Sequence, residues 1–138
     1  LAEAAAFADE YDFTDVKSLK RFFRMLPESA YRLLYNPLTR QLGTRMPEDR
    51  LHPGNSIAAI EILARVGIVG HKTRFPAFAS TLFDRLGIAA PIPVLPAIPA
   101  ETQALAERLR SVKAVEEMIV FDVAMSDAVK ASVDKSWS

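Results

Sequence analysis

The chain has 138 residues, half of them hydrophobic, which is enough for one folded domain with its own core. Its 17 basic and 17 acidic residues cancel, so the composition gives no reason to expect a nucleic-acid-binding surface. The absence of cysteine excludes disulfides and thiolate chemistry, and two isolated histidines, His52 and His71, do not predict a metal site.

The apolar segments are too short or too charged for a membrane protein. The longest run, residues 57–70, carries Glu61 and Arg65 and cannot span a bilayer. The alanine-rich first residues contain acidic side chains and no basic lead, so they do not form a signal peptide. We therefore expect no membrane span and a cytoplasmic location. The chain opens on leucine rather than methionine, which suggests a piece of a longer protein.

Residues 1–43 are predicted to form the N-terminal helices. Alanine propensity favours a helix over residues 2–10. A second helix is predicted over residues 16–26, with Thr14 or Asp15 as its N-cap and Pro27 ending it. Its expected apolar side consists of Val16, Leu19, Phe23 and Leu26. Its other side carries the cations Lys17, Lys20, Arg21 and Arg24. These cations indicate a solvated face, or alternatively a contact with an acidic substrate or nucleotide.

A third helical pattern starts at Ser29 and contains Pro37, which predicts a kink or a break at Tyr35 or Asn36. Polar side chains gather at this break, namely Asn36, Thr39, Arg40 and Gln41. By the physics of helix ends, such side chains satisfy free backbone groups. The other interpretation is a site for a polar ligand.

Residues 44–56 are rich in proline, glycine and charge, which predicts a long surface loop. His52 in this loop is a candidate general base, or more simply an exposed histidine. A helix is expected next, with its buried side formed by Ile57, Ile60, Leu63 and Ala64.

Residues 57–87 are predicted to form a central helix pair. Gly70 interrupts the apolar run and permits a backbone conformation that a side chain would hinder. Arg74 is expected to anchor the following turn, on a backbone carbonyl or on Asp84. His71 occupies an apolar position and is expected to be a packed, hydrogen-bonded ring. The second helix has an apolar stripe of Phe75, Phe78, Leu82 and Leu86, and Gly87 fits its left-handed C-cap.

Residues 88–99 contain four prolines and are predicted to be an extended, semi-rigid connector that packs along the body. A proline-motif ligand for a partner domain is the alternative, although its cationic anchor is missing. Residues 100–134 are predicted to form the C-terminal helices. Asp122 falls within their apolar stripe, so its carboxylate needs a partner, either structural or catalytic. Trp137 is expected to be frayed or loosely docked.

Several of these segments resemble, in order and spacing, the nucleotide-dependent sulfotransferases of the bacterial and carbohydrate-type branch. Over roughly residues 15–130 the matching positions are Ser18 to Phe23, Asn36 to Gly43, Val69, Gly70, Arg74, Phe75, Leu86 and Gly87, with a fainter echo at Asp122, Met125 and Ser126. His71 and Thr73 depart from the usual leucine and acid of that family.

The resemblance implies a sulfonate donor, 3′-phosphoadenosine 5′-phosphosulfate (PAPS), held by a glycine- and lysine-containing loop after a strand. This chain has no such loop, so we expect it to hold no cofactor and to be the helical C-terminal part of a larger α/β P-loop-type protein. Asn36, Thr39, Arg40 and Gln41 would then help to hold a carbohydrate or small hydroxyl acceptor. The expected partner is the missing N-terminal half or a second copy, and the chain alone is expected to be inactive.

The sequence thus predicts an all-α fold, a compact bundle of about five to seven helices. Two further classes stay open: a small all-helical protein-interaction module without catalysis, and a fragment of an enzyme other than a sulfotransferase.

Overall fold

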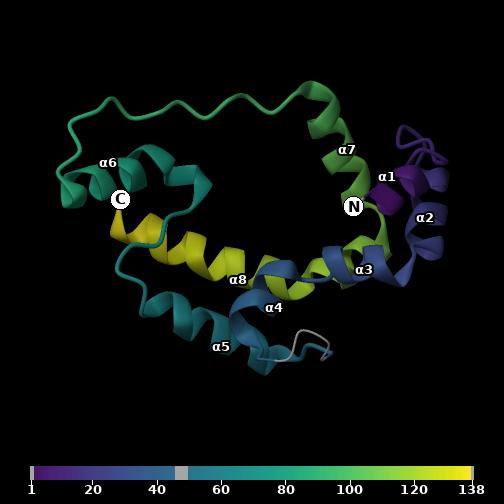
Figure 1. The fold of residues 1–138 in the computed structure, drawn as a ribbon, viewed down its shortest axis with the longest axis horizontal. Helices are drawn as coiled ribbons and strands as arrows, with labels where there is room; N and C mark the ends of the chain where they lie inside the picture. The colour runs from purple at the N-terminus through teal and green to yellow at the C-terminus, as the bar shows by residue number, and fades with distance from the viewer. Residues whose placement is uncertain (1, 46–49, 138) are drawn as a thin grey trace. The chain divides into compact units, whose positions relative to one another are not determined.

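The computed structural model describes residues 2–45 and 50–137, and these residues contain α-helices, one short 3₁₀ turn and no strand, which confirms the all-α class (Figure 1). The elements are α1 (Ala2–Ala8), α2 (Val16–Met25), α3 (Glu28–Leu34), α4 (Pro37–Gly43), α5 (Pro53–Ala64), η1 (Lys72–Arg74), α6 (Phe75–Leu86), α7 (Ala100–Arg110) and α8 (Lys113–Ser136). The described residues thus hold eight α-helices, where five to seven were expected.

The additional helix comes from the break between α3 and α4. Asn36 has a φ of 40°, in the left-handed region that asparagine tolerates better than most residues. Pro37 then opens α4, a position where its missing N–H is not needed. The break lies where the proline predicted it, and it produces two helices rather than one kinked helix.

The chain divides into two compact units, one formed within residues 1–37 and 97–120 and the other by 38–96 and 121–138. The sequence analysis expected a single helical domain or fragment. Helix α8 contributes residues to both units, and each unit is described separately below.

The first unit is built around Phe22, which is 8% exposed. The ring centroid of Phe22 lies 5.4 Å from that of Phe7, 5.3 Å from Tyr11, 5.1 Å from Phe13 and 5.0 Å from Phe23. Several of these pairs are edge-to-face, the arrangement that the aromatic quadrupole favours. This cluster joins α1, its following turn and α2.

Two details of α2 differ from or refine the prediction. The residues that it buries are Leu19 and Phe22, not Phe23 and Leu26, because the aromatic cluster lies on the Phe22 side. Its N-cap is Asp15, whose carboxylate accepts a hydrogen bond from the Ser18 N–H at 2.9 Å. The four cations Lys17, Lys20, Arg21 and Arg24 are exposed, as on a solvated face.

In the second unit α5 begins earlier than the sequence suggested. His52 is its N-cap: the ring Nδ1 accepts from the Gly54 N–H at 3.1 Å, and the Asn55 side chain accepts from the His52 N–H at 2.9 Å. Pro53 then takes the first helical position. The predicted loop 44–56 is therefore wrong from residue 53 onward, and its residues 46–49 lie outside the described residues.

The buried side of α5 also differs from the predicted one. Ser56 and Ala59 are buried, whereas Ile57 is 59% exposed. A Cβ placed on Gly43 would lie 2.1 Å from the Asn55 carbonyl oxygen and 3.4 Å from the Ala59 Cβ. The end of α4 thus approaches α5 so closely that only its small side chains fit between the two helices.

The connector 88–99 is extended, as four prolines require (Figure 1). All twelve of its residues are exposed, and Val94 reaches 93%. Only a shallow hollow, formed by Ile92 to Leu95 with Lys72, Phe75 and Pro76, brings it beside the start of α6. The expectation that its apolar side chains pack along the body is therefore wrong.

Candidate functional site

A polar stripe runs along the second half of α8 and consists of Asp122, Ser126, Lys130 and Asp134. Residues four apart lie on one face of an α-helix, so these four side chains follow one another along the helix axis. Their contacts reach two other segments of the second unit, α4 and the 70–75 turn.

Asp122 caps α4 from another helix. Its Oδ2 accepts a hydrogen bond from the Leu38 N–H at 3.0 Å, and its Oδ1 accepts one from the Thr39 N–H at 2.7 Å. The first N–H groups of a helix have no partner within that helix, and the helix dipole favours a negative charge there. The carboxylate thus has the partner that its place in an apolar stripe required, and that partner is structural.

His71 connects the 70–75 turn to α8 through both ring nitrogens. Nδ1 accepts from the Thr73 N–H at 3.3 Å and lies 2.9 Å from the Thr73 hydroxyl, which makes His71 the N-cap of η1. Nε2 lies 3.3 Å from the Ser126 hydroxyl. The half-buried ring is hydrogen-bonded on both sides, as its apolar position suggested.

Arg74 pairs with Asp134, not with Asp84 or a backbone carbonyl. The Arg74 Nε lies 3.1 Å from Asp134 Oδ1, and Lys130 also donates to the Asp134 carboxylate. The pKa of Asp134 is lowered, first by the hydrogen bond from Lys130 and then by that from Arg74. The sequence could not identify this acid because it lies 60 residues further along the chain.

The members of the predicted polar cluster, Asn36, Thr39, Arg40 and Gln41, differ in their exposure to solvent. Asn36 and Thr39 are completely buried, Arg40 is half-buried and Gln41 is exposed. The Asn36 N–H donates to the Met118 carbonyl at 3.0 Å within the first unit, whereas Thr39, Arg40 and Gln41 belong to the second. Only Arg40 and Gln41 can reach a ligand from solvent.

Glycine is needed at positions 70 and 87 for different structural reasons. Gly87 has a φ of 65° and is the left-handed C-cap of α6, as predicted. Gly70 does not have a positive φ; instead a Cβ there would lie 2.4 Å from the Phe78 ring. The glycine at position 70 is thus required by lack of space rather than by backbone conformation.

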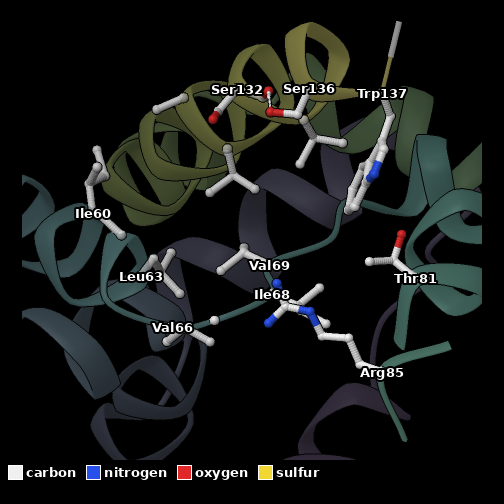
Figure 2. Close-up of a pocket in the computed structure, with 15 residues that line it drawn as sticks. Ile60, Leu63, Val66, Ile68, Val69, Thr81, Arg85, Ser132, Ser136 and Trp137 are labelled. Atoms are coloured by element: carbon white, nitrogen blue, oxygen red, sulfur yellow. Dashed lines mark hydrogen bonds between the residues drawn. The ribbon is translucent and has the colours of Figure 1, made fainter. Parts of the chain in front are cut away.

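A groove of about 390 Å³ in the second unit was not predicted from the sequence (Figure 2). Its walls come from the end of α5, the 66–69 segment, α6 and the end of α8. The lining residues are Ile60, Leu63, Ala64, Val66, Gly67, Ile68, Val69, Thr81, Arg85, Ala128, Val129, Ser132, Val133, Ser136 and Trp137. In the sequence, the one indication of this groove was the spacing of four between Thr81 and Arg85 and between Ser132 and Ser136. This spacing places each pair on one face of its helix.

Arg85 is the one charged residue among those that line the groove. Figure 2 shows its side chain extending toward Ile68 and Val69. Its Nη1 lies close enough to the backbone that a Cβ on Gly67 would be 3.6 Å away. Among the described residues it has no hydrogen bond or ion pair. Trp137, expected to be frayed or loosely docked, is half-buried and lines the same groove.

No group of three or more histidine, aspartate or glutamate side chains is arranged to hold a metal ion in the part of the chain that the structure describes. None of the helices that the structure describes is both long and apolar enough to cross a membrane.

Comparisons with known proteins give no relative: no protein-family model, curated protein or solved structure matches this chain.

Proposed function

We propose that this chain is the helical C-terminal portion of a sulfotransferase-like protein, where it shapes the acceptor side of the cleft and does not catalyse transfer alone. One observation supports the proposal most. The α8 stripe contacts α4 through Asp122 and the 70–75 turn through Ser126 and Asp134. These three segments are among those whose residues carry the sulfotransferase resemblance.

The donor nucleotide is assigned to a part of the protein other than these helices. PAPS needs free backbone N–H groups and a lysine around its phosphates. In this chain the N–H groups that open α2, α4 and α5 already donate to Asp15, Asp122 and His52. Among the described residues, the starts of α3, α6 and α7 have no side-chain cap. The three capped helix starts support placing the nucleotide in another part of the protein, and no chemical step is assigned to these helices.

On the acceptor side, the accessible members of the polar cluster are Arg40 and Gln41. A guanidinium group donates several hydrogen bonds, and an amide both donates and accepts, which suits the hydroxyl groups of a carbohydrate or similar acceptor. Asn36 and Thr39 are buried and would act by holding the backbone around these two side chains.

The test is steady-state kinetics of the full-length protein with PAPS and an acceptor. Gln41→Ala and Arg40→Ala should each raise the acceptor KM severalfold and leave the donor KM unchanged. Arg65→Ala, which removes an exposed arginine from the end of α5, is the matched control and should change neither constant. Unchanged acceptor KM in both cluster variants would refute the acceptor role.

An interaction module without catalysis is the second candidate, and exposed apolar side chains in the second unit favour it. Leu86, Ile88, Ile92, Val94 and Leu95 are each at least 38% exposed, along one continuous segment of chain. Large exposed apolar patches are typical of interaction sites. Sedimentation velocity tests it. Concentration-dependent association that Val94→Asp abolishes would favour a self-associating module or a covering partner, and a monomer at all concentrations would argue against self-association.

A further inference from the structure

We propose that the groove between α5, α6 and the end of α8 binds a small amphipathic monoanion, with an apolar body of alkyl or aryl carbon and one carboxylate. The inference rests on the geometry of the second unit alone and goes beyond the sulfotransferase proposal. It holds whether or not the chain belongs to a transferase.

The size and lining of the groove fit a small molecule. Its volume of about 390 Å³ falls within the range of ligand pockets, which are largely apolar with a few placed polar groups. Aliphatic side chains such as Leu63, Val69 and Val133 form most of its walls. A hydrocarbon body placed there would remove these walls from water, which favours binding.

The positive charge of Arg85 favours a negatively charged ligand in the groove. Arg85 is the only charged residue lining it, no acidic residue lines it, and the Arg85 guanidinium has no acidic partner among the described residues. A guanidinium next to apolar surface pairs well with a carboxylate, because its planar fork matches both oxygens and it is weakly hydrated. A cationic ligand would meet this charge without compensation.

Trp137 makes the proposal directly measurable. It is the only tryptophan of the chain and it lines the groove, so its fluorescence reports occupancy of this one place (Figure 2). Its indole N–H also supplies a donor on the groove wall. No other tryptophan has to be removed before the experiment.

The experiment titrates the folded chain with decanoate below its micelle concentration and follows Trp137 emission. The same titration with decanol and with decyltrimethylammonium varies the charge at constant chain length. An ω-bromoalkyl carboxylate then tests proximity, since bromine quenches only a nearby indole. We expect saturable binding of decanoate, with decanol and the cation each about fivefold or more weaker, and quenching by the brominated acid.

Four variants locate the site. Arg85→Gln should weaken decanoate binding about fivefold and remove the preference for the acid over the alcohol, while Arg85→Lys should retain that preference. Arg65→Gln removes the same charge from an arginine next to the groove that does not line it, and it should bind as the unmodified chain does. Ala128→Phe should block the groove and abolish quenching, with an unchanged circular dichroism spectrum showing that the chain is folded.

The proposal is overturned by any of three results: no saturable change in Trp137 emission, equal binding of the acid and the cation, or equal binding by the Arg85→Gln and Arg65→Gln variants. The last result would mean that decanoate only adheres to exposed apolar surface.

Discussion

The three glycines around α6, Gly67, Gly70 and Gly87, lie in different environments, and mutagenesis can distinguish these environments. Gly70 lies against the Phe78 ring, Gly87 adopts a left-handed backbone, and Gly67 has neither constraint, since a Cβ there would only be 3.6 Å from the Arg85 Nη1. One substitution, glycine to alanine, therefore has three different expected effects.

Gly70→Ala should lower the free energy of unfolding by about 1–3 kcal/mol, because the added methyl group overpacks against the Phe78 ring. Gly87→Ala should cost about 1 kcal/mol through its positive φ alone, since no atom lies near the added Cβ. Gly67→Ala should be neutral or stabilising by up to about 1 kcal/mol. Urea unfolding of the three variants measures this. Equal effects at Gly70 and Gly67 would show that the close contact with Phe78 is absent in solution.

The ion pair between Arg74 and Asp134 should make the stability of the folded chain depend on pH. The pKa of Asp134 is lowered in the folded chain, so its contribution to stability is present above the unfolded carboxyl pKa, about 3.9. That contribution is lost as pH falls through the folded pKa, where the carboxylate takes up its proton. Arg74→Ala should therefore lower the melting temperature at neutral pH.

Below about pH 3.9 the difference in melting temperature between Arg74→Ala and the unmodified chain should shrink toward zero. Arg24→Ala, which removes an exposed cation at the end of α2, serves as the control and should show no such pH-dependent difference. A melting-temperature difference for Arg74→Ala that is the same at acidic and neutral pH would contradict the ion pair with Asp134.

At the scale of secondary-structure elements, the account depends on α8 and on the capping of α4 by Asp122. Helix α4 has only seven residues, so it depends on tertiary partners. The Asp122 carboxylate supplies two hydrogen bonds at its N-terminus. Removing them should therefore affect α4 before it affects the rest of the second unit.

Asp122→Ala should lower the free energy of unfolding by about 1–2 kcal/mol, because two helix N–H groups lose their acceptor. Hydrogen exchange at the Leu38 and Thr39 amides should accelerate in this variant. Asp127→Ala removes the same charge from an exposed position of the same helix. It should leave the free energy of unfolding within about 0.5 kcal/mol of the unmodified chain and the exchange of these two amides unchanged. Unchanged protection of Thr39 in Asp122→Ala would exclude the cap.

The sequence predicted local features of these elements well and long-range ones poorly. The helix class, the break at Asn36, the Asp15 cap and the Gly87 cap follow from local chemistry that a few residues specify. The His52 cap was missed because histidine is an uncommon N-cap residue. The Asp134 partner of Arg74 and the groove around Arg85 were missed because they join segments far apart in the chain.

Buried faces were mispredicted for a related reason. The helical period identifies an apolar stripe but not which neighbour covers it, so α5 buries Ser56 and Ala59 where Gly43 approaches and leaves Ile57 exposed. Similarly, the proline pattern predicted that residues 88–99 are extended, but it could not show that all twelve of these residues stay exposed.

At the scale of the whole molecule, we propose that these helices belong to a sulfotransferase-like protein and do not bind its donor alone. Exposed arginines contribute at most about 1 kcal/mol each to anion binding, and even millimolar affinity needs about 4 kcal/mol in total. Isolated surface cations are therefore insufficient without a cradle of free N–H groups.

The most direct measurement is calorimetric titration with adenosine 3′,5′-bisphosphate, the product that remains when PAPS loses its sulfonate, on this chain and on the full-length protein in parallel. The account predicts no binding heat for the 138-residue chain and saturable binding by the full-length protein. Micromolar binding by the chain itself would contradict the assignment of the donor site outside these helices. Absence of binding by the full-length protein would remove the sulfotransferase proposal and leave the interaction module as the better account.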